Sequence, residues 1–206
     1  MLDLLIGRRE LGKTTLALHL ARNSDTRVIW DPRHMIHTTA DVLTDSQVTG
    51  ILYEMLDTRP EIVVRPHFDI DGTFSAMCEE IYNWVRENPD QKFCLLVDES
   101  RFVSEPEKNF YFDFIVRCTP SKYVTVIFTA HSAIDISTHL RRIADFWVLF
   151  QMTMQSDLQA VRERCGPEVE REVQTLQPYQ FIVWNDGLRK WRKRTDSKTW
   201  YTRMAA

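Results

Sequence analysis

The chain has 206 residues, of which 44% are hydrophobic and 27% are charged, and its net charge is −3. These values predict a globular protein with room for one α/β domain, and they exclude the overall basicity typical of many nucleic-acid-binding proteins. The four cysteines show no zinc-binding spacing, and no apolar run reaches the ~18 residues of a membrane-spanning helix.

The first expected strand, residues 2–6, leads into the sequence Gly7-Arg8-Arg9-Glu10-Leu11-Gly12-Lys13-Thr14. This G-x-x-x-x-G-K-T pattern is typical of the phosphate-binding loop of nucleoside triphosphatases, and a helix at residues 15–21 follows it as the loop requires. We expect the loop to bind ATP, with Lys13 on the β- and γ-phosphates and the Thr14 hydroxyl on Mg²⁺. Thr15 either adds a phosphate contact or only caps the helix.

The rest of the chain alternates between expected strands and helices. In chain order these are a strand at residues 27–32, a helix at 41–57, a strand at 61–66, a helix at 74–86, a strand at 92–97, a helix at 107–117, a strand at 123–128, a short helix or loop at 137–143, a strand at 145–152 and a helix at 156–165. A hairpin then pairs residues 181–184 with 190–194 across an Asn-Asp-Gly turn.

Alternating strands and helices predict the α/β class, with a mostly parallel sheet flanked by helices, to which the hairpin adds an antiparallel edge. We expect a single domain over residues 1–206. Its nucleotide-binding core would cover residues 1–155, and residues 156–206 would form a C-terminal helix and a basic hairpin.

Two carboxylates, Asp98 and Glu99, follow the apolar strand at residues 92–97. After a phosphate-binding loop, this arrangement is typical of a Walker B motif. We expect Asp98 to hold Mg²⁺ through water and Glu99 to act as the general base that activates the attacking water. The alternative is a pair of surface acids at the end of a strand.

Other polar residues are candidates for contacts with the γ-phosphate. Thr129 and His131 follow the strand at residues 123–128, where a sensor of the γ-phosphate is expected, and we favour Thr129. Arg141 and Arg142 are candidates for an arginine finger that a neighbouring subunit inserts, with Arg8 and Arg9 of the loop as rivals. Ordinary surface charge is the alternative for all four arginines.

Four segments together resemble the FtsK–HerA superfamily of P-loop ATPases. They are the G-R-R-x-x-G-K-T loop, V-I-W-D-P-R at residues 28–33, L-L-V-D-E at 95–99 and V-I-F-T-A-H at 126–131. Within the superfamily, the small size resembles the genome-packaging ATPases of double-jelly-roll, membrane-containing viruses. The resemblance covers residues 1–155. Superfamily members often carry a glutamine in the sensor strand, where this chain has Thr129 and His131.

The resemblance implies a homo-oligomeric ring, usually a hexamer, that translocates double-stranded DNA with energy from ATP hydrolysis. It further implies genome packaging into a procapsid, with capsid vertex or portal proteins as partners. Such a protein would be soluble and intracellular, in a virion or in the host cytoplasm.

A basic and aromatic segment at residues 189–194 is the expected DNA contact, continued by Lys198, Trp200, Tyr201 and Arg203. Loops at residues 104–108 and 67–73 compete for this role, and charges that protect an exposed edge strand are the alternative explanation.

Three other functions compete with the DNA motor. The first is a small-molecule kinase or another small P-loop nucleoside triphosphatase. The second is a phage assembly ATPase of the zonula occludens toxin type, although those proteins carry a membrane span. The third is a nucleotide-gated scaffold without hydrolysis.

Overall fold

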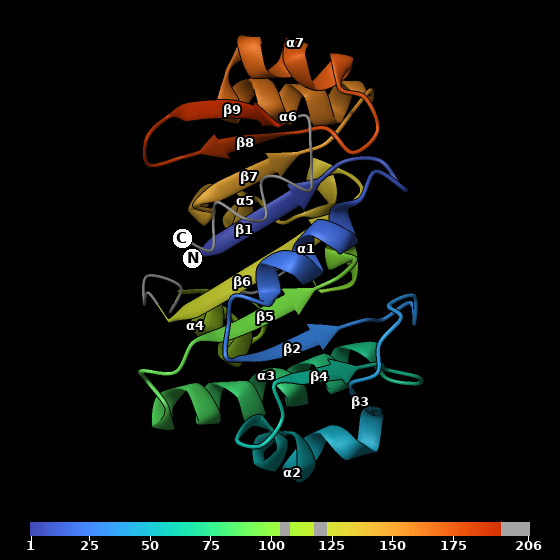
Figure 1. Ribbon diagram of the computed structural model, residues 1–206, viewed down its shortest axis with the longest axis vertical. Helices are drawn as coiled ribbons and strands as arrows, with labels where there is room; N and C mark the ends of the chain where they lie inside the picture. Colours follow the sequence, from blue (N-terminus) through green and yellow to red (C-terminus); the bar gives the residue numbers. More distant parts are fainter. Residues whose placement is uncertain (104–107, 118–122, 195–206) are drawn as a thin grey trace.

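The computed structural model describes residues 1–103, 108–117 and 123–194, and strands within these residues form one nine-stranded sheet. Its order is β3-β4-β2-β5-β6-β1-β7-β8-β9 (Figure 1). The strands are β1 (Leu2–Ile6), β2 (Thr26–Trp30), β3 (Asp41–Leu43), β4 (Glu61–Val64), β5 (Phe93–Val97), β6 (Val124–Ala130), β7 (Phe146–Leu149), β8 (Phe181–Asn185) and β9 (Lys190–Arg194).

The seven strands from β3 to β7 in this order run parallel, whereas β8 pairs antiparallel with β7 and β9 antiparallel with β8. The parallel strands therefore end at one shared edge, here called the carboxyl edge. Ligands of open α/β sheets bind in crevices outside this edge. The fold confirms the predicted parallel sheet and the antiparallel C-terminal hairpin.

Helices cover both faces of the sheet (Figure 1). One helix, α1 (Lys13–Ala21), packs on one face, and the others contribute to the core on the opposite face. These are α2 (Asp45–Leu56), α3 (Ile70–Glu87), α4 (Phe110–Arg117), α5 (Thr138–Ile143), α6 (Gln155–Cys165) and α7 (Pro167–Thr175).

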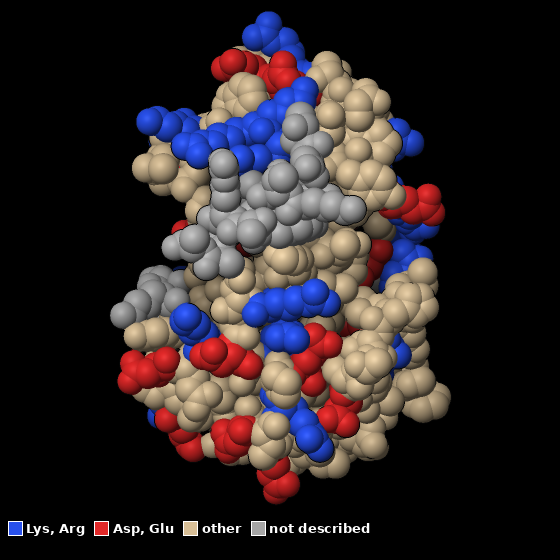
Figure 2. Space-filling view, viewed as in Figure 1, with Lys and Arg blue, Asp and Glu red and all other residues tan. Residues whose placement is uncertain are grey.

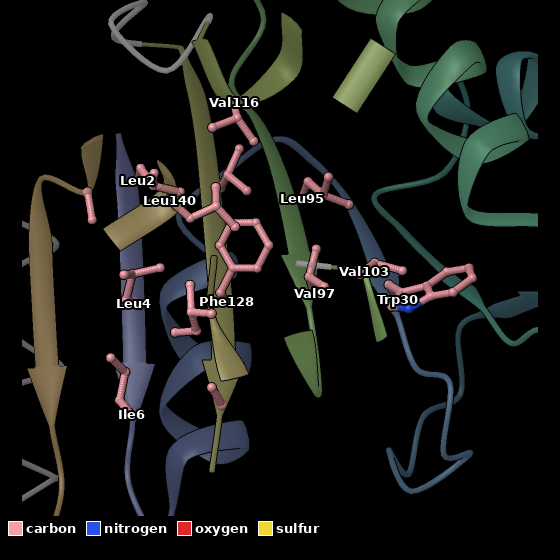
Figure 3. Packing of buried hydrophobic residues seen from close by; sticks show 14 of the residues in the cluster. Leu2, Leu4, Ile6, Trp30, Leu95, Val97, Val103, Val116, Phe128 and Leu140 are labelled. Carbon is pink, nitrogen blue, oxygen red and sulfur yellow. The ribbon is translucent and has the colours of Figure 1, made fainter. Parts of the chain in front are cut away.

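The alternation of side chains along β1 explains this two-sided core. Leu2, Leu4 and Ile6 point to the face that carries most helices, together with Phe128 of β6 (Figure 3). Leu5 points to the face that α1 covers. Because helices cover both faces of the sheet, the sequence of β1 is a nearly continuous apolar run and does not alternate between apolar and polar residues.

The prediction of a helix at residues 41–57 is wrong for the first turn. Asp41–Leu43 instead form the edge strand β3, which pairs in parallel with β4. Thr44 then caps α2 in a reciprocal capping box with Gln47, which places the start of the helix at Asp45. A three-residue strand has too few residues to show a periodicity of its own, so only its pairing partner reveals it.

Two further differences concern helices. α3 begins at Ile70, so much of the 67–73 segment that we considered as a loop is helical, with Asp69 as its N-cap. α7 was not expected from the sequence. Pro167 at its first turn and the buried pair Val169 and Val173, four residues apart, are the signals that indicate it. The strand expected at residues 145–152 is shorter, and α4 begins at Phe110.

In the part of the chain that the structure describes, none of the helices is both long and apolar enough to span a membrane. Residues 104–107 and 195–206, which include part of one candidate DNA-contacting loop and Lys198, Trp200, Tyr201 and Arg203, lie outside the described residues.

Candidate nucleotide-binding site

The phosphate loop connects the carboxyl end of β1 to the start of α1, with backbone geometry that only glycine adopts easily at two positions. Gly7 has a φ of +152°, and a Cβ there would lie 2.6 Å from the Cβ of Phe150. Gly12, the N-cap of α1, has a φ of +91°. No side chain caps α1, so its first N–H groups are available to an anion.

Lys13 lies at the bottom of this loop, with only 5% of its surface exposed. Its Nζ donates a hydrogen bond to the carbonyl oxygen of Arg8 at 2.7 Å and lies 3.3 Å from Nδ1 of His131. Burial lowers the pKa of Lys13 to about 8, and the carboxylates of Glu99 and Asp98 oppose this shift. The ammonium group is thus held inside the loop.

Asp98 follows β5 and accepts hydrogen bonds from two threonines. The hydroxyl of Thr14 donates to its Oδ1 at 3.0 Å, and the hydroxyl of Thr129 donates to the same atom at 2.6 Å. Burial raises the pKa of Asp98, and these two hydrogen bonds counteract the rise. Because β5 and β6 are neighbours in the sheet, Thr129 lies directly beside Asp98.

The Thr14 and Asp98 pair fits a Mg²⁺ site of the kind that completes its coordination with phosphates and water. Mg²⁺ is usually held by one or two protein oxygens rather than by an all-protein cage. The described residues contain no group of three or more His, Cys, Asp or Glu side chains placed to hold a metal. The Thr14 hydroxyl and the buried Asp98 carboxylate lie 3.0 Å apart, so both face the same place beside the loop.

Glu99 has a backbone conformation that is unusual for its residue type. Its φ of +56° lies in the left-handed region, which costs a non-glycine residue about 1–2 kcal/mol. Its Oε1 lies 3.1 Å from Nη1 of Arg33 and 2.5 Å from Nε2 of His131. The backbone N–H of Glu99 donates to the hydroxyl of Thr129 at 3.2 Å. The carboxylate is therefore held between two basic side chains.

His131 links Glu99 to Lys13 across the site. Its Nε2 faces Glu99, and its Nδ1 faces the ammonium group of Lys13. Burial lowers the pKa of His131, and the nearby charge of Lys13 lowers it further, against the influence of Glu99. Among the two residues that we considered as γ-phosphate sensors, His131 lines the cavity described below, whereas Thr129 is buried behind Asp98 and 3% exposed.

The loop after β2 brings Arg33 to the site. Asp31, completely buried, accepts hydrogen bonds from the backbone N–H groups of Met35 and Ile36, and its Oδ2 forms an ion pair with Nε of Arg65 at 2.9 Å. These contacts fold the loop against β4. The D-P-R sequence thus has a structural role, since Asp31 shapes the loop that presents Arg33.

These residues surround a cavity of about 350 Å³ at the carboxyl edge. It is lined by Arg9, Glu10, Gly12, Lys13, Thr14, Thr15, Arg33, Met35, Asp98, Glu99 and His131. Arg33 and Met35 were not expected in the site. The sequence alone does not indicate them, because their approach depends on β2 lying next to β5 in the sheet.

Other predicted site residues do not line this cavity. Gly7, Arg8 and Leu11 support the loop, with Leu11 buried and the backbone N–H of Arg8 bonded to Gln151. Arg141 and Arg142 lie at the end of α5, near the amino edge of the sheet, where the carbonyl oxygen of Arg142 accepts a hydrogen bond from Arg164. They are far from the nucleotide site of their own chain, so any finger role requires a neighbouring subunit.

No protein-family model and no curated protein matches the sequence. Among solved structures, the genome packaging NTPase B204 from Sulfolobus turreted icosahedral virus 2 in complex with sulfate has a TM-score of 0.74 and 16% identity, covering 94% of this chain and 95% of that chain. Its complex with ATP-gammaS has a TM-score of 0.75 and 14% identity, covering 94% and 96%. EssC (ATPases 2 and 3) from Geobacillus thermodenitrificans has a TM-score of 0.51 and 12% identity, covering 89% of this chain and 37% of that chain. The chain therefore has the fold of P-loop ATPases, which confirms the predicted fold class.

Proposed function

We propose that the protein is an ATP-hydrolysing motor that translocates double-stranded DNA, and that it packages a viral genome into a procapsid. One observation carries the hydrolytic part of this proposal. Lys13, Asp98 and Glu99 converge at the end of the phosphate loop, on elements that are far apart in sequence. The fold, shared with a genome packaging NTPase that binds an ATP analogue, supports the motor part.

The chemistry follows from the placement of these side chains. The N–H groups of the loop and the ammonium group of Lys13 bind the phosphates of ATP. Thr14 and Asp98 would hold Mg²⁺, which when bound neutralises phosphate charge. Glu99 accepts a proton from the attacking water as the water oxygen bonds to the γ-phosphorus, and the bond from that phosphorus to the β–γ bridging oxygen breaks. The products are ADP and phosphate.

One carboxylate oxygen of Glu99, Oε1, contacts Arg33 and His131 and is less available to water than it would be without them. The γ-phosphate would attract the guanidinium group of Arg33, since it carries more negative charge than the carboxylate. ATP binding would thereby free the carboxylate of Glu99 to accept a proton from the attacking water. Without a bound γ-phosphate, the carboxylate would stay in its present contacts.

The β8–β9 hairpin supports the DNA-binding part of the proposal. Figure 2 shows Lys and Arg side chains gathered over β9, which contains Lys190, Arg192, Lys193 and Arg194. Trp191 packs against the hydrophobic core and Lys193 forms an ion pair with Glu172, so we infer that Lys190 and Arg192 make the DNA contacts. Cationic side chains bind phosphates without reading sequence, as a translocating motor requires.

The direct test is ATP hydrolysis by the purified protein with and without double-stranded DNA, with Lys13→Ala as the inactive control. We expect DNA to stimulate hydrolysis by wild type and to have no effect on Lys13→Ala. Hydrolysis that DNA leaves unchanged would favour a small-molecule nucleoside triphosphatase, and no ATP binding at all would contradict the proposal.

A second arm tests the hairpin. The double variant Lys190→Ala with Arg192→Ala should weaken DNA binding and reduce the slope of log affinity against log salt by about 0.9 for each DNA phosphate that the variant no longer neutralises. The matched control, Arg22→Ala with Lys92→Ala, removes the same charge from exposed positions elsewhere and should leave that slope unchanged. Equal effects of the two double variants would show that only net charge matters.

A further inference from the structure

We propose that Tyr179 forms the surface on which the base of the bound nucleotide stacks, an inference that rests on the nucleotide-binding function proposed above. Tyr179 precedes β8, in a segment to which the sequence motifs assign no role. Its position, backbone conformation and exposure each point to a ligand that lies beside the phosphate loop.

The antiparallel direction of β8 places Tyr179 at the carboxyl edge. Ile6, the last residue before the phosphate loop, pairs with Leu149, and Leu149 pairs with Ile182 of β8. The start of β8 therefore lies level with the end of β1. Tyr179, three residues before Ile182, lies at the same edge as the loop, although the two are more than 160 residues apart in the chain.

The ring of Tyr179 approaches the phosphate loop itself. A Cβ on Gly12 would lie 3.0 Å from Cδ1 and 3.5 Å from Cε1 of the Tyr179 ring. Gly12 also lines the cavity of the nucleotide site. The tyrosine is nevertheless 61% exposed, so most of its ring surface remains open to solvent next to the start of α1.

A strained turn holds Tyr179 in this place. The backbone N–H of Gln180 donates to the carbonyl oxygen of Gln177 at 3.0 Å, and the side chain of Gln180 accepts from the N–H of Gln177 at 3.1 Å. Pro178 and Tyr179 occupy the two central positions, and Tyr179 has a φ of +65°. Glycine or asparagine is usual at such a position, because a tyrosine there costs about 1–2 kcal/mol.

This cost is not compensated by burial of the ring, since the side chain is largely exposed. Strained, exposed residues beside a binding site are most simply explained by the ligand that they contact. The turn presents a preformed aromatic face, so little conformational entropy would be lost when a base stacks on it.

The order of strands gives the direction in which the nucleotide lies. Asp98 and Glu99 follow β5 and His131 follows β6, on one side of β1, whereas Tyr179 precedes β8, on the other side. The carboxylates mark the end of the site where the γ-phosphate is hydrolysed. A nucleotide has its base at the opposite end from its γ-phosphate, so the base extends toward Tyr179.

Stacking of this kind tolerates different bases, because every base has a π-face, but larger purine rings stack better than pyrimidines. We therefore expect the protein to bind ATP and GTP with similar affinity and CTP more weakly. Met35, the exposed apolar residue that lines the cavity, follows β2 on the side of the carboxylates and is poorly placed to contact the base.

The test compares binding of Mg²⁺–ATP with binding of Mg²⁺–tripolyphosphate, which has the phosphates but no base. Tyr179→Asn keeps a residue that tolerates a positive φ and removes the ring, whereas Tyr179→Phe keeps the ring. We expect Tyr179→Asn to weaken ATP binding about fivefold or more and to leave tripolyphosphate binding unchanged. Tyr179→Phe should bind both probes like wild type.

Leu188→Asn is the matched control, because Leu188 is 67% exposed in the turn at the opposite end of β8. It should bind both probes like wild type. Thermal unfolding of each variant checks the fold, and we expect Tyr179→Asn to be at least as stable as wild type because its backbone strain is smaller.

Unchanged ATP binding in Tyr179→Asn would overturn the role of Tyr179 while the proposed function stands. Equal weakening of ATP and tripolyphosphate would show that Tyr179 only supports the loop, and would also overturn it. If wild type bound neither probe, the proposed function itself would fail.

Discussion

At the scale of one residue, Glu99 differs from an ordinary surface acid at the end of a strand. Its left-handed backbone and its contacts with Arg33 and His131 place the carboxylate at the cavity, although a strand end in the sequence gives no reason to expect a strained residue. Strain of this kind persists where the surrounding structure holds it, and here the hydroxyl of Thr129 accepts a hydrogen bond from the N–H of Glu99.

Substitution of Glu99 tests its role as general base. Glu99→Gln should retain ATP binding and reduce hydrolysis by about 10²- to 10⁴-fold, because the amide cannot accept a proton from water. ATP affinity and single-turnover hydrolysis should be measured on the same preparation. Glu79→Gln, a change of the same kind on the distant helix α3, is the control, and normal turnover by Glu99→Gln would contradict the assignment.

The lowered pKa of Lys13, about 8, predicts a pH dependence of nucleotide binding. As pH rises through this pKa, the free site loses the ammonium charge that phosphates need, so ATP affinity should fall by up to about tenfold between pH 7 and pH 9. The other groups that face Lys13 are Arg9, Asp98, Glu99 and His131, and the pKa of the histidine is lowered away from this range.

Lys13→Arg provides the comparison, because an arginine stays charged throughout this range. Its affinity for ATP, although weaker overall, should show no fall between the same pH values. Isothermal titration at each pH measures both proteins, and a parallel fall in Lys13→Arg would assign the pH dependence to another group.

At the scale of elements, the buried carboxylate of Asp31 determines how the loop after β2 is folded. It bonds the N–H groups of Met35 and Ile36 and the side chain of Arg65, so the segment after β2 is folded back onto β4. The same segment carries Arg33 to Glu99. The position of this contact in the candidate site is therefore decided by Asp31, whose side chain does not line the cavity.

Asp31→Ala should lower the free energy of unfolding by about 3 kcal/mol, because it leaves the partly buried guanidinium group of Arg65 and two N–H groups without their partner. Urea unfolding measures this. Asp41→Ala is the matched control. Asp41 forms an ion pair with Arg59 in which both side chains are at least half exposed, and its removal should cost less than about 1 kcal/mol. Similar destabilisation in the two variants would show that Asp31 contributes no more than surface charge.

At the scale of the whole molecule, the sheet separates the nucleotide from the candidate fingers. Lys13 lies at the carboxyl edge, and Arg141 and Arg142 lie near the amino edge, where the N–H of Asp145 bonds to the carbonyl oxygen of Leu2. An arginine of α5 would therefore reach a nucleotide only in a neighbouring subunit. A head-to-tail arrangement of subunits that achieves this forms a ring if the rotation between subunits closes and a helical filament if it does not.

Mixing two inactive variants tests this arrangement. Lys13→Ala subunits lack a nucleotide site and Arg141→Ala subunits lack the finger, so about a quarter of the interfaces in an equal mixture would combine an intact site with an intact arginine. We expect DNA-stimulated hydrolysis to recover to a similar fraction of the wild-type rate. Arg142→Ala is tested in the same way, and the absence of recovery in both mixtures would rule out a finger on α5.

The sequence by itself determined the parts of this protein whose residues are close together along the chain. The phosphate loop, the carboxylates after β5 and the hairpin turn are each contained in one short segment, and local spacing specifies them. The alternation of apolar strands and helices was enough to predict the parallel sheet, because covered strands must be apolar on both faces.

Only the tertiary structure decided which distant segments share the site. Arg33 meets Glu99 because β2 lies beside β5, and Tyr179 meets Gly12 because β8 runs antiparallel beside β7. The edge strand β3 exists because β4 offers it a partner. Strand order and strand direction are properties of the whole sheet, since each pairing depends on all the others, and no short stretch of sequence contains them.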